Sequence, residues 1–313
     1  MKNITALRVY VIIIFLFFSN YSVYCQNREK TYVFSAGPQF GFVYGQAQEL
    51  LYALPKDTMN EFLSELKWDI KPVYYAGIEL NYGLLDPMAS AGFFSSLSFK
   101  AGFPNDSGIH ENRDWMSPDN SNLTHFSSHT NRTRQFFALD TEFGFSLPVG
   151  SFLCVKPFVS GSWMRLAFTG RDGYGIYPNG EHSFTGDVIR YKQDWFIFAP
   201  GLSVGTRFFA FFYFDVSCRV SMFTYCAAKD EHIQVKKTFM DYTLAGFFLE
   251  PAGRFSFIQN WLELSLEFSY RRIGRTNGQT YTSYDNMNFF LEQNKAGAGL
   301  SLMDTRFLVK MRF

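Results

Sequence analysis

Apolar and polar residues alternate along much of this chain, and that pattern limits what it can fold into. From Leu262 to Tyr270 every even-numbered residue is apolar and every odd-numbered residue is polar. The same alternation marks Phe212–Met222, and every second residue is apolar in Phe307–Phe313. Successive side chains of a β-strand point to opposite faces, so this period predicts strands with one apolar and one polar face.

The one long uninterrupted apolar segment lies near the beginning. Val9–Phe18 follows the basic residues Lys2 and Arg8 and precedes a short polar stretch. This arrangement is typical of a secretory signal peptide and is too short for a spanning helix. We therefore expect residues 1–25 to be a signal peptide and residues 26–313 to form a single domain.

The composition combines a high content of hydrophobic residues with a low mean hydropathy. Hydrophobic residues make up 47% of the chain and aromatic residues 19%, yet the mean hydropathy is only −0.09. A secreted chain whose last alternating strand ends in Phe313 resembles outer-membrane barrels. In hydrocarbon only a closed barrel lets strands satisfy every backbone group, and the many Phe and Tyr would form its lipid-facing band. The alternative is a soluble β-sandwich with an aromatic core.

The pattern predicts an all-β fold, a ten-stranded antiparallel transmembrane β-barrel that extends above the outer membrane. The expected strands are 32–53, 61–83, 89–103, 133–147, 151–169, 187–206, 207–228, 237–257, 261–274 and 297–313. Long polar segments near 104–132, 170–186 and 275–296 read as loops, and long loops of such barrels face the outside of the cell.

Charge and cysteine content exclude some functions. The net charge of +1 becomes −1 once residues 1–25, with Lys2 and Arg8 and no acid, are removed. This balance gives no support for nucleic-acid binding. Cys154, Cys218 and Cys226 are an odd number, so they predict no disulfide framework.

Two short motifs carry the residues of a hydrolytic site. Asp230-Glu231-His232 ends one predicted strand, and Asn112-Arg113-Asp114 lies in the polar segment 104–132. On extended backbone a carboxylate two residues before an imidazole lies on the same side as the ring. Asp230 can then orient His232 as a general base.

Several further motifs occur together with these two, in an order that spans most of the mature chain. They are Gly45–Tyr52 (GQAQELLY), Leu63–Trp68 (LSELKW), Asp114–Met116 (DWM), Pro178–Glu181 (PNGE), Tyr191–Gln193 (YKQ) and Asp230–His232 (DEH). Their shared order resembles the omptin family, ten-stranded outer-membrane aspartyl endopeptidases.

The resemblance implies a catalytic arrangement. In omptins a pair of aspartates faces an aspartate–histidine pair, and a water between them attacks the peptide bond. The resemblance places catalytic roles on Asp114, Asp230 and His232. The remaining aspartate is replaced by Asn112, which supplies no charge and accepts no proton. Glu111 is an alternative if the register shifts by one residue.

The expected function is an outer-membrane endopeptidase of reduced activity, with its site on the extracellular side of the bacterial outer membrane. The alternative is a catalytically impaired barrel that acts as an adhesin or host-protein receptor, and a small pore is a third reading. We expect polypeptide substrates, a monomer, no cofactor and no metal. His125 and His129 are four residues apart, but no third ligand is placed beside them.

Single residues that match or depart from omptin positions indicate the expected substrate and lipid preferences. Glu49 matches an omptin acid that receives the basic side chain before the cut, but the companion acid of that pocket falls at Ala228. His125 stands where some omptins have another acid. Among the basic residues that bind lipopolysaccharide in omptins, Arg165 matches one and Asp194 replaces another, which argues against lipopolysaccharide dependence.

Strand parity conflicts with the assignment of Asp230 and His232. Even-numbered residues of Phe212–Met222 would face lipid, and simple continuation of the strand would turn Asp230 and His232 outward as well. A bulge at residues 226–228 would turn them into the cleft, and bulges recur at barrel rims beside active sites. The alternative is that both are ordinary solvated loop residues.

Overall fold

The computed structural model describes residues 31–53, 62–117, 121–209, 211–285 and 287–313. The predicted signal peptide, residues 1–25, lies outside these residues. Every regular element in the described ranges is a β-strand, which confirms the all-β prediction. No helix in the described part of the chain has the length and apolar character needed to cross a membrane.

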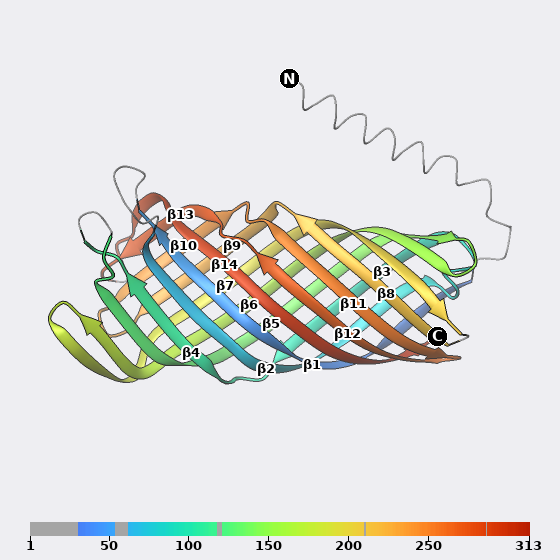
Figure 1. Ribbon diagram of the computed structural model, residues 1–313, viewed down its shortest axis with the longest axis horizontal. Coiled ribbons are helices and arrows are strands. Elements are labelled where there is room, and N and C mark those ends of the chain that lie inside the picture. The colour runs from blue at the N-terminus through green and yellow to red at the C-terminus, as the bar shows by residue number, and fades with distance from the viewer. Residues whose placement is uncertain (1–30, 54–61, 118–120, 210, 286) are drawn as a thin grey trace, which may run out of the picture.

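The strands form one elongated, antiparallel, tilted sheet that curls around an interior (Figure 1). Their bounds are β1 Tyr32–Tyr52, β2 Phe62–Leu84, β3 Gly92–Gly102, β4 Asn105–Asp114, β5 His125–Val149, β6 Leu153–Tyr177, β7 Gly180–Phe208, β8 Phe212–Ser221, β9 Phe223–His232, β10 Lys237–Leu244, β11 Phe248–Gln259, β12 Leu262–Ile273, β13 Asn277–Ser283 and β14 Phe290–Arg312.

The predicted count of ten strands was wrong, because the described residues form a 14-stranded sheet. Two expected strands are each divided, 207–228 into β8 and β9 and 237–257 into β10 and β11. Two expected loops contain the strands β4 and β13. Pro104 separates β3 from β4, since proline has no N–H to donate to a neighbouring strand.

Hydrogen bonding connects the strands in a circuit, because β1 pairs with both β2 and β14. We call the end of the barrel at the right of Figure 1 the lower half and the end at the left the upper half. In the lower half the order is β1-β2-β3-β5-β6-β7-β8-β11-β12-β14. In the upper half, β4, β9, β10 and β13 replace β3, β8, β11 and β12. Neighbouring strands thus satisfy one another's backbone groups around both halves, as a membrane requires.

The outer wall of the lower half is apolar. Large side chains are exposed on it from almost every strand; examples are Phe40, Tyr74, Phe143, Phe198, Phe214, Phe268 and Phe307. This arrangement fits a lipid-facing band, with the alternate residues turned into the barrel. Lys310, whose two sequence neighbours face outward or partly outward, is one of the buried inward residues.

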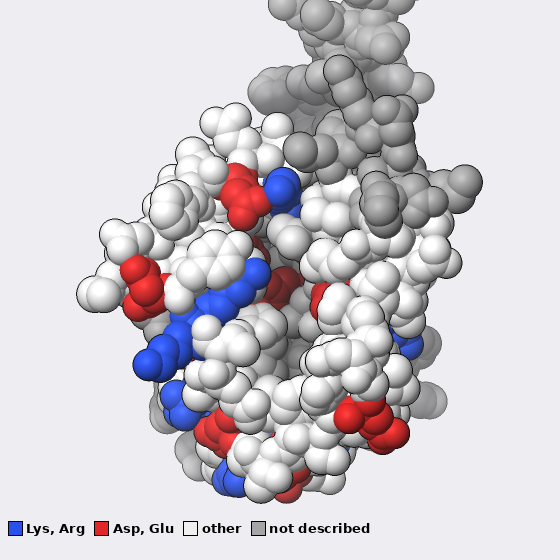
Figure 2. Space-filling view, turned by 90° about the vertical axis from the view of Figure 1, so that its left-hand side faces the viewer, with Lys and Arg blue, Asp and Glu red and all other residues white. Residues whose placement is uncertain are grey.

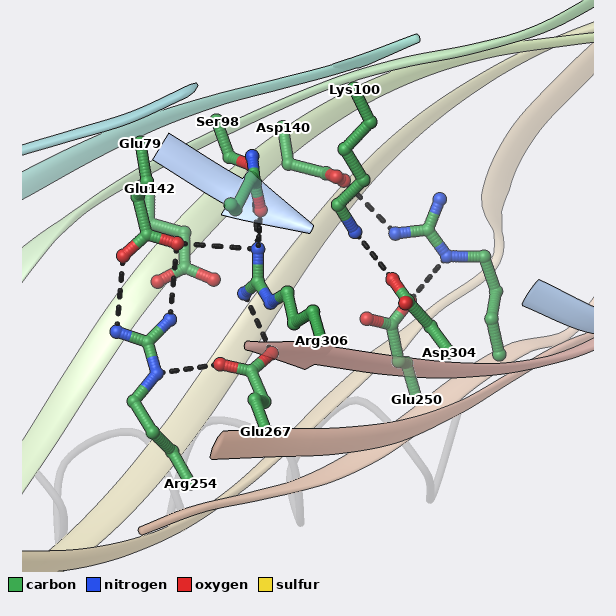
Figure 3. A network of polar contacts seen from close by, with 12 residues as sticks. Glu79, Ser98, Lys100, Asp140, Glu142, Glu250, Arg254, Glu267, Asp304 and Arg306 are labelled. Carbon is green, nitrogen blue, oxygen red and sulfur yellow. Dashed lines mark hydrogen bonds and ion pairs between the residues drawn. The ribbon is translucent and has the colours of Figure 1, made fainter. Parts of the chain in front are cut away.

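Ion pairs fill the interior of the lower half (Figure 3). Arg254 donates from Nε to Glu267 Oε2 at 2.6 Å and from Nη1 to Glu79 Oε1 at 3.1 Å. Lys310 Nζ lies 3.1 Å from Glu79 Oε1 and 2.8 Å from Glu263 Oε1. Further pairs join Arg219 and Arg271 to Glu250, Lys100 to Asp304, and Lys156 to Asp215. The acids of the lower half therefore have cationic partners.

Aromatic side chains occupy the interior of the upper half instead. Trp68 is fully buried and stacks on Tyr191, with ring centroids 5.4 Å apart, and on Phe168 at 5.5 Å. His110, which lies opposite Trp68 on β4, also stacks on it, with ring centroids 3.8 Å apart. This packed layer gives the wall around Asp230 a rigid support, because Asp230 lies directly opposite Tyr191 in the β7–β9 pairing.

Candidate active site

Asp230 and His232 lie on β9 and form a pair. His232 Nε2 is 2.8 Å from Asp230 Oδ2, as expected for residues two apart on one face of a strand. Asp230 is only 1% exposed, whereas the side chain of His232 keeps 29% of its surface accessible. The alternative of ordinary solvated loop residues is therefore wrong, and the ring can meet both its buried carboxylate and water.

A bulge explains why these residues face inward. Phe198 of β7 pairs with Phe223, whereas Gly201 pairs with Arg219. Two residues of β7 therefore lie opposite the three residues 220–222, and the inward face changes from odd positions in β8 to even positions in β9. The predicted location at residues 226–228 was wrong; the shift occurs nearer the middle of the wall.

Asn112 and Asp114 lie on β4, not in the loop that was expected at 104–132. Ser64 Oγ donates to Asn112 Oδ1 at 3.2 Å, and Asn112 Nδ2 donates to Asp114 Oδ2 at 3.4 Å. Glu111 instead pairs with Arg113 at 2.9 Å on the opposite face of β4. The register-shift alternative is thus wrong, and Asn112 holds the position beside Asp114.

The two motifs face each other across the upper opening. In the upper circuit β4 and β9 are separated by β5, β6 and β7 on the shorter side. Burial raises the pKa of Asp114 above its usual range, although a hydrogen bond from Ser64 and the charges of His125 and His232 oppose this rise. The charge of each group also shifts the pKa of the other, which agrees with the position of both strands at the same end of the barrel.

Charged groups on both sides of His232 shift its pKa. Burial lowers its pKa, but the charge and hydrogen bond of Asp230 outweigh this, and Asp114 adds to their effect, so the pKa lies above its usual value. Lys237, directly opposite His232 on β10, opposes the rise. The sequence interpretation did not single out Lys237, which packs over the rings of Phe239 and Tyr284.

Glu49 belongs to the same site. It lies on β1, is 6% exposed, and has a pKa raised well above its usual range by burial and by the charges of Asp230 and Asp241. Ala228 is buried two residues before Asp230. Asp241 was also missed from the sequence; its alternation with the exposed Tyr242 and Leu244 could have marked it as inward.

The remaining histidines form a separate stack. His110 and His129 have ring centroids 5.6 Å apart, and burial lowers the pKa of both. His125 lies higher, opposite Asp114 in the β4–β5 pairing. No three His, Cys, Asp or Glu side chains of the described ranges are grouped as metal ligands.

Arg165 and Asp194 lie on adjacent strands and bind each other. Arg165 Nε donates to Asp194 Oδ1 at 2.7 Å and Nη2 donates to Oδ2 at 3.1 Å. This bidentate pair uses two of the five N–H donors of Arg165 and neutralises the charge with which Arg165 would hold a phosphate.

The upper end is hollowed. Figure 2 shows acidic side chains inside a central depression, with Lys and Arg side chains beside its opening. The depression is open to solvent and its floor is buried, so it suits an extended polar ligand such as a peptide segment.

Comparisons with known proteins give a family and a fold. The model of the omptin family matches residues 30–313. The crystal structure of the outer membrane protease OmpT from Escherichia coli has a TM-score of 0.79 and 18% identity, over 90% of this chain and 97% of that chain. The comparison with curated proteins finds no match.

Other solved barrels are less similar. The translocator domain of the autotransporter NalP from Neisseria meningitidis has a TM-score of 0.33 and 8% identity, over 99% of this chain and 98% of that chain. The toluene transporter TodX from P. putida has a TM-score of 0.31 and 10% identity, over 91% of each chain. Both differ too much from this barrel to bear on its function.

Proposed function

Because the chain belongs to the omptin family of outer-membrane proteases, we propose that it cleaves polypeptides with a water molecule activated by His232 and Asp230. The observation that carries this proposal is the 2.8 Å contact between these two side chains at the open end of the barrel. Asp114 faces them from β4, so a peptide lying in the depression would pass between two polar groups.

The contact with Asp230 supports His232 as the general base of this proposal. Its Nε2–H donates to Asp230 Oδ2, so the lone pair that accepts a proton from water is on Nδ1. Asp230 fixes this tautomer and stabilises the imidazolium that forms when water attacks. No covalent intermediate is needed, because the nucleophile is water itself.

Asp114 and Asn112 have complementary roles in this proposal. Asp114 accepts hydrogen bonds and orients the attacking water. Asn112 uses one N–H for Asp114 and its carbonyl for Ser64, which leaves a second N–H to donate to the oxyanion of the tetrahedral intermediate. A preorganised donor of this kind stabilises charge that develops only in the transition state.

Reduced activity follows from the missing carboxylate. Asn112 cannot share the positioning of water as an aspartate would, but the general base is retained. A positioned base contributes roughly 10²- to 10⁴-fold. We therefore expect slow cleavage, with a preference for a basic residue before the cut because Glu49 is a buried carboxylate beside Asp230.

Surroundings of the site support an extracellular location in the outer membrane. The long hairpins β4–β5, β6–β7 and β13–β14 extend at the site's end, and long connections of outer-membrane barrels face outward. The Arg165–Asp194 pair supports a barrel that works without lipopolysaccharide at this position, since the charge of Arg165 already has a partner.

The test is cleavage of an Arg-containing fluorogenic peptide by refolded protein and by His232→Ala. The expected result is slow cleavage by the unaltered protein and a further loss of at least about 100-fold in the variant, the size of a general-base contribution. Equal rates in the two proteins would remove the assignment of His232.

One observation favours a second function, a receptor or adhesin without efficient hydrolysis. Asn112 gives the β4 side of the site one carboxylate instead of two. Under this second hypothesis the depression binds a peptide and releases it without cleavage. Tight binding of peptides that stay uncleaved by both the unaltered protein and Asn112→Asp would establish it.

A further inference from the structure

The acids of the barrel interior fall into two groups with different surroundings. In the lower half, Glu79, Glu263 and Glu267 each have Arg or Lys within 3.1 Å. In the upper half, Glu49 and Asp241 form no ion pair with Lys or Arg of the described ranges. A buried carboxylate without a cation is costly, so such groups mark functional sites.

Two oxygens in the upper group lack partners altogether. Glu49 Oε2 and Asp230 Oδ1 are buried and accept no hydrogen bond from any residue in the described ranges. Glu49 is 6% exposed and Asp241 is 4% exposed, so both carboxylates are buried in the upper interior. Oxygens of this kind are arranged to accept hydrogen bonds from a ligand, because leaving them unpaired costs free energy.

Strand pairing places Asp241 beside the position where an acid is absent. Asp241 of β10 lies directly opposite Ala228 of β9, and both side chains face inward. Directly opposed residues have Cβ atoms roughly 4.5–5.5 Å apart. Because Ala228 is small, it leaves space beside the Asp241 carboxylate on the β9 side, whereas Thr280 of β13 lies opposite Asp241 on the other side and forms a hydrogen bond with it.

The other neighbours of Ala228 are consistent with a formed pocket. Gln193 of β7 lies opposite Ala228 on its second side. Its Nε2 donates to the Gln48 carbonyl of β1 at 2.8 Å and its Oε1 accepts from Trp195 Nε1 at 2.9 Å. Gln193 thus connects β7, the strand next to β9, to the residue before Glu49 on β1 across the interior.

Electrostatic coupling agrees with this placement. Burial raises the pKa of Asp241 to about 7, and the charge of Asp230 contributes to the rise. The pKa of Glu49 is raised by burial and by both Asp230 and Asp241. The raised pKa values show that burial and the neighbouring acids disfavour the ionised forms of Glu49 and Asp241, and a bound cation would favour those ionised forms.

We propose that Asp241 and Glu49 together bind the positively charged side chain of the substrate residue before the cut, with Asp241 supplying from β10 the acid that position 228 lacks. This assignment rests on the proposed function. The carboxylates are not grouped closely enough to ligate a metal ion. A guanidinium suits them better, because its five N–H donors spread in a plane and can reach two or three separate acceptors.

The test measures binding without requiring turnover. His232→Ala protein, silenced under the proposed mechanism, is titrated with an Arg-containing peptide and with the same peptide carrying citrulline, a neutral isostere of Arg. We expect the Arg peptide to bind at least about tenfold tighter, and Asp241→Asn in this background to reduce that ratio to about two or less, the loss of a charge-assisted hydrogen bond.

A matched control and a rescue variant separate a binding role from a structural one. Glu231→Gln removes the same charge from β9 on the outward side, where Glu231 pairs with Lys229, and should leave the ratio unchanged. Adding Ala228→Asp to Asp241→Asn returns an acid to the pocket from the neighbouring strand and should restore the ratio. Refolding of each variant is checked by its heat-dependent mobility in detergent gels.

The outcomes distinguish this proposal from the proposed function. An Arg-over-citrulline ratio that survives Asp241→Asn in folded protein overturns the role of Asp241, whatever the cleavage rate. Absence of any cleavage by the unaltered protein overturns the protease, whereas a ratio that Asp241→Asn abolishes and Ala228→Asp restores upholds the pocket. Loss of the ratio in Glu231→Gln as well would reduce the effect to overall charge and contradict the proposal.

Discussion

Asn112 is the residue at which this site departs most from a paired-carboxylate arrangement. Its amide contacts Ser64 and Asp114 at once, so both of these side chains have a hydrogen-bond partner at this position. It also removes a like charge 3.4 Å from Asp114 Oδ2. The exchange therefore keeps the local structure and changes the chemistry, because an amide can hydrogen-bond to a water but cannot accept a proton from it.

Restoring the carboxylate should raise activity. In Asn112→Asp two carboxyl groups lie within hydrogen-bond range, so one of them keeps a proton near neutral pH and the pair can hold the attacking water. We expect kcat/KM for an Arg peptide to increase by about tenfold or more. Asn122→Asp adds the same charge in the exposed loop and should change nothing. An unaltered rate in folded Asn112→Asp would show that this position does not limit catalysis.

The pH dependence of cleavage reports on His232. Its pKa lies above the usual value because Asp230 stabilises the imidazolium, and a base must be neutral to accept a proton. The rate should therefore fall as pH drops through that raised pKa. Asp230→Asn removes the stabilising charge, so the acidic limb of kcat/KM should move to lower pH while the maximal rate falls by about tenfold or more. A limb that stays in place or moves to higher pH contradicts the pairing.

At the scale of the strand, β4 depends on an unusual backbone at Gly108. Gly108 has φ +100, and a Cβ at this position would lie 2.7 Å from the Asp69 side chain. The β4–β5 register shifts here, between Asp106 and Ile109. Glycine permits both the positive φ and the close approach, and this bulge sets which residues of β4 face the depression.

Gly108→Ala should displace β4 and lower activity more than stability. The strain and the contact with Asp69 together cost about 1–3 kcal/mol, and a small shift of Asp114 costs up to about 100-fold in rate. Gly150→Ala is the matched control, since Gly150 has φ +69 but a methyl group added there would have no neighbour within 4 Å. Peptide cleavage and urea unfolding of both variants check this; equal activity losses would contradict a specific role for β4.

The sequence predicts strands only where their two faces meet different solvents. In β8 and β12 the alternation is regular because one face meets lipid and the other the lumen, and both were recognised. In β4 and β13 both faces meet water or polar groups, so no period of two develops and the segments were taken for loops. The motif at Asp230–His232 was found because its spacing is local.

The register of the strands could not be predicted from the local sequence pattern. The bulge at residues 220–222 follows from how β8 and β9 pair with β7, and nothing in their own residues fixes its position. Asp241 escaped notice for a similar reason: its relation to Ala228 exists only in the β9–β10 pairing. Contacts between residues far apart in sequence, such as Gln193 with Gln48, were equally unpredictable.

At the scale of the whole molecule, the barrel separates stability from binding. The lower interior is neutralised by its own Arg and Lys, whereas the upper interior keeps acids without cations. The lower network also crosses the lumen with ion pairs around a cavity, and these side chains narrow the lumen, which opposes the small-pore hypothesis. Membrane insertion and the proposed peptide recognition thus use different halves of the same continuous strands β1, β2, β5, β6, β7 and β14.

The lower network can be tested through one buried pair. Lys310 and Glu263 lie opposite each other on β14 and β12, with 2.8 Å between Nζ and Oε1. Lys310→Met leaves Glu263 without its cation and should lower the free energy of unfolding by about 3–5 kcal/mol. The double variant with Glu263→Gln should recover much of that loss, and the Arg preference should stay unchanged in both. A change in preference would contradict the separation of the two halves.

The proposed mechanism depends most on His232 acting as the general base, and chemical rescue tests this role directly. The cleavage rate of an Arg peptide is measured for His232→Ala with and without added imidazole. We predict a rate at least about 100-fold below that of the unaltered protein, partly restored by imidazole in proportion to its neutral form. Cleavage by His232→Ala at the unaltered rate would contradict this role.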